Sequence, residues 1–175
     1  MSSMGPLDLS DANIKGFEAV DAGRYNAKVF ALDMDAVKNT SGRGKMPAGT
    51  AMIKVQFKLT ADNIDPSVEN KRVFVSYVIP PEGYDQKKAA TMKGMIARFF
   101  MALGTPEEQV MSNAFDPDFE AFLDRDCVVV VGKEPKRTSD GVVIDGEYNN
   151  PVKGVKAAGS IGSPGENGES GSGLL

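Results

Sequence analysis

The sequence contains no histidine and a single cysteine among its 175 residues. Without histidine, the chain has no residues for a Ser-His-Asp or Cys-His catalytic arrangement or a Cys/His zinc site. Its one cysteine, Cys127, cannot form a disulfide within the chain. Cys127 is followed by four valines, which predicts a buried strand. We therefore expect Cys127 to be a small core side chain rather than a nucleophile.

Long apolar runs are missing as well. No stretch approaches the roughly 20 apolar residues that cross a bilayer. The N-terminus, Met1–Pro6, has neither the basic nor the apolar region of a secretory signal. We expect an intracellular, cytoplasmic protein without a membrane partner, which agrees with an unpaired thiol.

Acidic residues are absent from one stretch of an otherwise acidic chain. The net charge is −4, yet residues 36–61 contain cations and no carboxylate. A negatively charged protein that keeps one basic surface is suited to bind a polyanion there. The cations of this stretch are Lys38, Arg43, Lys45, Lys54 and Lys58.

Composition divides the chain into three parts. Residues 1–22 are a small, polar and acidic arm, residues 23–158 form the folded domain, and residues 159–175 are a flexible Gly/Ser-rich tail. Within the domain, apolar residues recur with a period of two in several segments and with a helical period over 85–103. A capping box at Thr105 predicts a second short helix, and Asp116-Pro117 opens a third. The predicted strands are 24–37, 50–60, 71–79, 126–133 and 141–148.

This order predicts a mostly β fold with a helical insert. A helix between the third and fourth of five strands is typical of a five-stranded OB-fold-like barrel. The alternative is an α+β sheet covered by one helix.

The outward faces of the first three strands predict a binding surface. Alternation places Val55 and Phe57 inside and Lys54 and Lys58 outside. Cations bind phosphates and aromatic rings stack on unpaired bases, so this surface suits single-stranded nucleic acid. Alternatively, Phe30 and Phe74 pack in the core and the lysines are only solvated. Leu32 falls on the side of the first strand that is predicted to face outward, so the orientation of that strand stays open. On the other two strands, the predicted outward residues include Lys28, Phe30, Arg72 and Phe74.

The Gly-rich segment 39–49 fails the tests for a phosphate loop. Gly44-Lys45 is followed by Met46 where a Walker-type loop needs Ser or Thr. We interpret the segment as a basic flap whose Arg43 and Lys45 close over a bound strand, or else as a solvated hairpin tip. A group of carboxylates over 107–126 is interpreted as a solvated acidic face rather than a metal site.

Several segments resemble one protein family. They are Gly23–Val29, Lys38–Gly44, Ile53–Leu59, Asn70–Val75, Ala102–Gly104 and Gly146–Lys153. Together they resemble phage single-stranded-DNA-binding proteins found with replication and recombination genes. The resemblance implies an OB-type barrel that coats unwound DNA. The tail departs from the strongly acidic tip usual there, since it carries only Glu166 and Glu169.

We therefore predict a non-enzymatic, sequence-tolerant single-stranded-DNA-binding protein that needs no metal or cofactor. Its expected partners are single-stranded DNA, phage or host replication and recombination proteins, and a second copy of itself; its location is then the host cytoplasm. The alternative is a phage structural or protein-interaction accessory factor with no nucleic-acid role. The predicted DNA contacts are Lys28, Phe30, Arg43, Lys45, Lys54, Lys58, Arg72 and Phe74.

Overall fold

A computed structural model describes residues 6–8, 10, 19–38 and 46–161. The predicted contacts Arg43 and Lys45 lie outside the described residues, as do most of the predicted arm and residues 162–175 of the tail.

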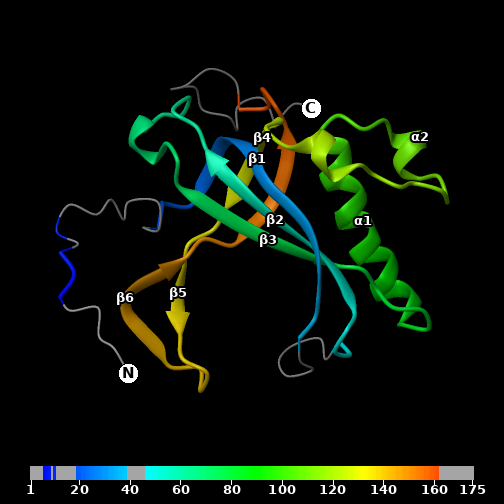
Figure 1. The fold of residues 1–175 in the computed structure, drawn as a ribbon, viewed down its shortest axis with the longest axis horizontal. Helices are drawn as coiled ribbons and strands as arrows, with labels where there is room; N and C mark the ends of the chain where they lie inside the picture. The colour runs from blue at the N-terminus through cyan, green and yellow to red at the C-terminus, as the bar shows by residue number, and fades with distance from the viewer. Residues whose placement is uncertain (1–5, 9, 11–18, 39–45, 162–175) are drawn as a thin grey trace.

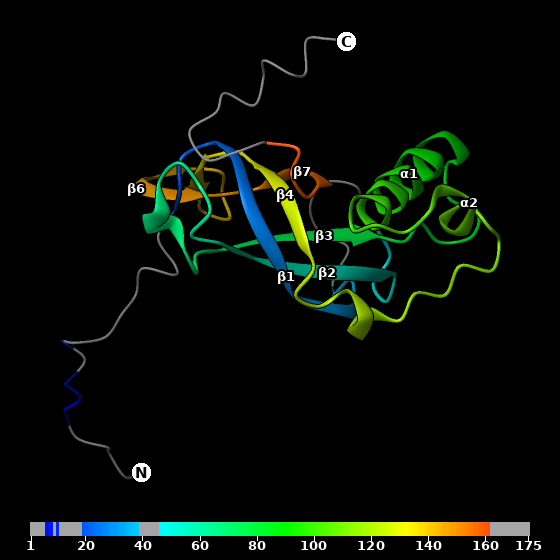
Figure 2. The ribbon, with the colours of Figure 1, turned by 90° about the horizontal axis from the view of Figure 1, so that it is seen from above.

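Strands form most of the described structure. A five-stranded antiparallel sheet has the order β3-β2-β1-β4-β7, and β5 and β6 form a separate hairpin. In Figures 1 and 2, this hairpin and α1 lie at opposite ends of the molecule. The strands are β1 (Gly23–Ala36), β2 (Ala51–Leu59), β3 (Arg72–Val78), β4 (Asp126–Val131), β5 (Glu134–Arg137), β6 (Val143–Asn149) and β7 (Val152–Ala157). The helices are α1 (Gln86–Ala102) and α2 (Glu107–Val110), with 3-10 turns at Pro66–Val68 and Phe119–Phe122.

The predicted mostly β fold with a helix between the third and fourth strands is confirmed. The closed barrel is not formed. Within the described residues, the edge strands β3 and β7 share no ladder of hydrogen bonds. One isolated bridge, between Phe74 of β3 and Pro151 just before β7, links the two edges. Helix α1 contacts both edge strands and lies beside this opening.

A β-bulge in β1 decides which side chains face the core. Val29 pairs with Phe57 and Ala31 with Gln56, so Phe30 is an extra residue without a partner on β2. An extra residue reverses the alternation beyond it. Lys28 and Phe30 therefore face outward, while Leu32 is buried at 5% exposure. The bulge removes the ambiguity that Leu32 raised for this strand.

The core forms between the inner face of the sheet and α1. The rings of Phe57, Phe99 and Phe100 are fully buried, and Phe99 meets Phe57 edge-on with ring centroids 6.2 Å apart. Cys127 is buried, as predicted, at 1% exposure. None of the helices in the described part of the chain combines the length and apolar character that a membrane crossing needs.

The predicted short helices after α1 are present, but three local details differ from the sequence analysis. Thr105 is buried and its N–H donates to the carbonyl of Phe100, so it closes α1 instead of capping α2, which begins after Pro106 without a side-chain cap. The 3-10 turn Phe119–Phe122 begins after Asp118, whose side chain caps it, rather than directly at Asp116-Pro117. The strands β5 and β7 were not predicted, because neither segment has a clear apolar alternation.

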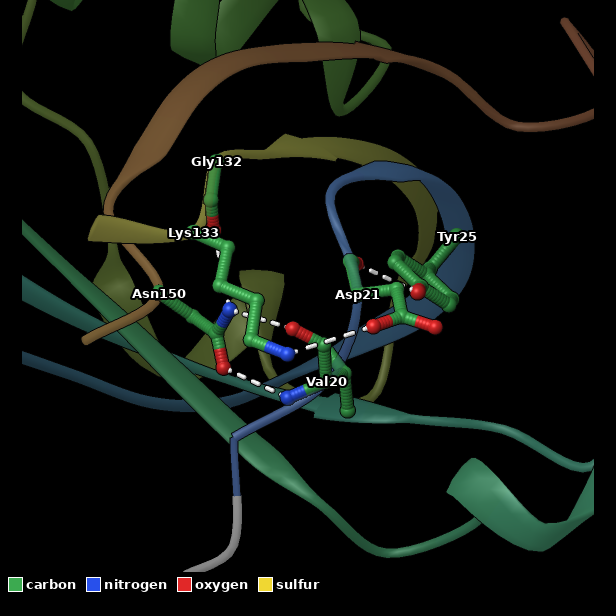
Figure 3. A network of polar contacts seen from close by, with 6 residues as sticks. All are labelled: Val20, Asp21, Tyr25, Gly132, Lys133 and Asn150. Atoms are coloured by element: carbon green, nitrogen blue, oxygen red, sulfur yellow. Dashed lines mark hydrogen bonds and ion pairs between the residues drawn. The ribbon is translucent and has the colours of Figure 1, made fainter. Parts of the chain in front are cut away.

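One asparagine ties together three segments around the start of β1 (Figure 3). The Asn150 side chain accepts a hydrogen bond from the Val20 N–H and donates to the carbonyls of Val20 and Gly132, each at 2.8 Å. Lys133 reaches Asp21 at 3.3 Å in the same network. Asn150 thus fixes the entry to β1 against the loop that follows β4.

Replacing Asn150 with Ala should destabilise the fold. The change removes three hydrogen bonds and leaves the polar backbone of buried Val20 without these partners, for a loss of about 2–4 kcal/mol. Urea unfolding measures this loss. Asn149→Ala, at an exposed neighbouring position, is the control and should change stability by less than about 0.5 kcal/mol; equal effects of the two changes would contradict the role of Asn150.

Cys127 should be unreactive in the folded protein. Burial, with a smaller contribution from the charge of Asp126, raises the pKa of the thiol to about 12. Since only the thiolate attacks a disulfide reagent, we expect no reaction with Ellman's reagent at pH 8 under native conditions and release of one equivalent after denaturation. Rapid labelling of the native protein would show that β4 opens readily.

Candidate nucleic-acid interface

Three cations lie side by side on the outward face of the sheet. In the strand register, Lys28 on β1 is opposite Lys58 on β2, and Lys58 is opposite Arg72 on β3. Neighbouring strands are about 4.8 Å apart, so these residues form a straight line across the strands. We call Lys28, Lys58 and Arg72 the cation row.

Two exposed aromatic rings accompany the cation row. Phe74, at 56% exposure, follows Arg72 on the outward face of β3, and Phe30, at 39% exposure, projects from the bulge of β1. Between these strands, Gln56 of β2 is opposite both Phe74 and Ala31. The orientation predicted for both phenylalanines is confirmed, and the alternative that they pack in the core is wrong.

The Phe30 ring holds two members of the cation row. Lys58 Nζ lies 4.6 Å and Arg72 Cζ lies 4.4 Å from the ring centroid. A cation over an exposed ring is stabilised by about 0.5–1 kcal/mol. The ring positions both side chains without cancelling their charge. In contrast, no cation in the described residues lies over the Phe74 ring.

The other two predicted cations of this face are paired with carboxylates. Lys28 Nζ lies 3.0 Å from Asp126 of β4, and Lys54 Nζ lies 3.3 Å from Asp35 of β1. A hydrogen bond from the Ala36 N–H, and then the contact with Lys54, lower the pKa of Asp35 below its ordinary value. Asp35 is therefore ionised near neutral pH and offsets the charge of Lys54.

A shallow groove of about 340 Å³ runs beside Phe74. Its lining changes character from one side to the other, with Phe74 and Gln56 toward the cation row and Asp33 and Asp35 away from it. The groove can take a planar group against the Phe74 ring, while on its far side the carboxylates offset the charge of Lys54.

Six of the eight predicted contact residues thus share one face. They are Lys28, Phe30, Lys54, Lys58, Arg72 and Phe74; Arg43 and Lys45 lie outside the described residues. The sequence interpretation did not foresee the ion pairs that Asp35 and Asp126 form with two of these cations, and it assigned Asp126 to the solvated acidic face. No sequence signal reveals such pairs, because they depend on strand register.

The carboxylates of the described residues do not gather as a metal centre would require. No three His, Cys, Asp or Glu side chains in this part of the chain are placed to hold a metal ion. The acidic segment between α1 and β4 instead carries exposed side chains such as Glu107, Glu108 and Asp116.

Comparisons with known proteins identify a family but no activity. The family model described as "Protein of unknown function (DUF669)" matches residues 7–164, which is most of the chain. Among curated proteins, none matches the sequence.

Phe74 should be dispensable for folding. Its ring is more than half exposed, so Phe74→Ser should change the free energy of unfolding by less than about 0.5 kcal/mol in urea titrations. Phe99→Ala, which removes a ring at 1% exposure, should lose about 3–5 kcal/mol and serves as the comparison. A large loss from Phe74→Ser would mean that this ring has a structural role.

Proposed function

The chain belongs to the DUF669 family, and we propose that it binds single-stranded DNA without strong sequence preference, on the outward face of β1, β2 and β3. The observation that carries the proposal is Lys58 and Arg72 of the cation row with two exposed aromatic rings beside them, on a protein of net charge −4. Cations neutralise phosphates and release counterions, and rings stack on bases. The face offers both interactions at once.

The two rings have different tasks in this proposal. Phe74 is open and stacks on a base, which contributes about 1–3 kcal/mol. Phe30 already holds Lys58 and Arg72 at 4.6 and 4.4 Å, so it positions these cations for phosphate. Because only an unpaired base exposes its flat surface to Phe74, single strands are preferred over duplex.

The proposal also describes the fold as an OB-like barrel and gives the protein a role in phage DNA replication or recombination. Strand order, the helix between β3 and β4, and the bridge between Phe74 and Pro151 support an OB-like barrel left open on one side. The resemblance of the sequence to phage single-stranded-DNA-binding proteins supports the biological role, and the proposal includes the host cytoplasm as the location.

Fluorescence anisotropy with labelled oligo-dT, at about 50 and 200 mM salt, tests the proposal. We expect binding at low salt that weakens steeply at high salt, and weaker binding to a duplex of equal length. No binding at low salt, or equal binding to single strand and duplex, would overturn it and favour an accessory role in protein interactions.

Variants locate the binding face. Lys58→Gln with Arg72→Gln should weaken binding and reduce the slope of log K against log salt by about 1.4, or about 0.7 for each phosphate contact to a single strand. Phe74→Ser should weaken binding without changing this slope. Lys87→Gln with Lys88→Gln on exposed positions of α1 is the control with the same charge change, and an equal loss there would refute the assignment of the face.

A further inference from the structure

We propose that Asp126 and Asp35 limit the DNA site by holding Lys28 and Lys54 in ion pairs, so that phosphate contact centres on Lys58 and Arg72. This inference rests on the proposed function and defines the extent of its site. In this inference the two carboxylates weaken DNA binding, whereas the cations strengthen it.

Asp126 closes one end of the cation row. In the register, Lys28 is opposite Asp126 on β4 as well as Lys58 on β2. The row therefore runs as three positive charges followed by one negative charge, and Lys28 Nζ lies 3.0 Å from the carboxylate. A phosphate at Lys28 must displace this carboxylate and also approaches its negative charge.

Asp35 lies further along β1, on the side of Phe30 that points away from the cation row. Its Oδ1 accepts a hydrogen bond of 2.8 Å from the Ala36 N–H, which fixes the carboxylate while it contacts Lys54 at 3.3 Å. Asp33, directly opposite Lys54 in the register, adds a second carboxylate nearby. The two carboxylates therefore offset the positive charge of Lys54 and of nearby Lys38 on this side of the groove.

Lys58 and Arg72 lie outside these two ion pairs, on β2 and on the edge strand β3. Neither forms an ion pair with a carboxylate of the described residues. Their shared partner is the neutral Phe30 ring, which keeps them together and leaves their charge available. A bound strand then crosses β2 and β3 along the cation row, with its bases directed toward Phe74.

A double-mutant cycle with Asp126→Asn and Lys28→Gln tests the inference by oligo-dT anisotropy. Asp126→Asn should tighten binding about threefold to tenfold at low salt and steepen the salt slope by about 0.7, because it frees one lysine. Lys28→Gln alone should change affinity by less than about twofold, since its charge is already offset. In the double variant, the gain from Asp126→Asn should disappear, because it requires Lys28.

Asp33→Asn is the matched control. It removes the same charge from the same face, but Asp33 has no ion pair within the described part of the chain. We expect Asp33→Asn to raise the affinity for oligo-dT by less than half as much, on a logarithmic scale, as Asp126→Asn does. Asp35→Asn should behave like Asp126→Asn and lose its gain when combined with Lys54→Gln. All of these positions except Asp35 are exposed, and thermal melts of each variant verify that the fold is retained.

The outcomes separate the two proposals. If the wild-type protein does not bind oligo-dT at low salt, both the proposed function and this inference fail. If it binds, but Asp126→Asn gains no more than Asp33→Asn, or keeps its gain without Lys28, only the inference fails. A loss from Lys28→Gln as large as that from Lys58→Gln would also overturn it, because Lys28 would then be available to phosphate in spite of Asp126.

Discussion

The single extra residue in β1, Phe30, is the constraint on which both faces of the sheet depend. β1 pairs with β4 along its first half and with β2 along its second. Strict alternation from Lys28 onward would turn Leu32 to solvent and Asp33 into the core, where an unpaired carboxylate is very unfavourable. The bulge reverses the alternation at the one point where both problems are avoided. The extra residue is Phe30, whose ring lies under Lys58 of β2 and Arg72 of β3, so the same irregularity keeps the core apolar and supplies the ring that holds these two cations.

The sequence predicts well those features that depend on local periodicity. The alternation around Val55 and Phe57 assigns both faces of β2 correctly, and the helical spacing over 85–103 predicts α1 to within a few residues. The capping box at Thr105 fails because the same residue can serve two helices: its N–H closes α1 at the Phe100 carbonyl, and burial then removes it from α2. The sequence offers two locally reasonable uses of this residue, and in the structure the end of α1 takes it.

Features that depend on strand register could not be predicted. The alignment of Lys28, Lys58 and Arg72, and the pairing of Lys28 with Asp126, follow from which residues oppose one another across four strands. β7 illustrates the same limit, because Val152–Ala157 contains Gly154 and two lysines and forms a strand through its backbone pairing with β4. The structural role of Asn150 could not be predicted either, because its hydrogen bonds join segments that are distant in sequence.

The cation row is a local conflict between folding and binding. Like charges directly opposite one another on adjacent strands destabilise a sheet, and such conflicts tend to occur at functional sites. The fold relieves the conflict in two ways with different electrostatic results. At Lys28, the carboxylate of Asp126 offsets the charge, in an exposed pair worth about 0–1 kcal/mol. At Lys58 and Arg72, the Phe30 ring gives about 0.5–1 kcal/mol per cation and carries no net charge. Stabilisation is similar in size at the two places, but only over Phe30 does the positive potential persist toward solvent. Among the described cations of the row, Lys58 and Arg72 therefore keep their charge open to solvent, and our proposal assigns them the phosphate contacts for this reason.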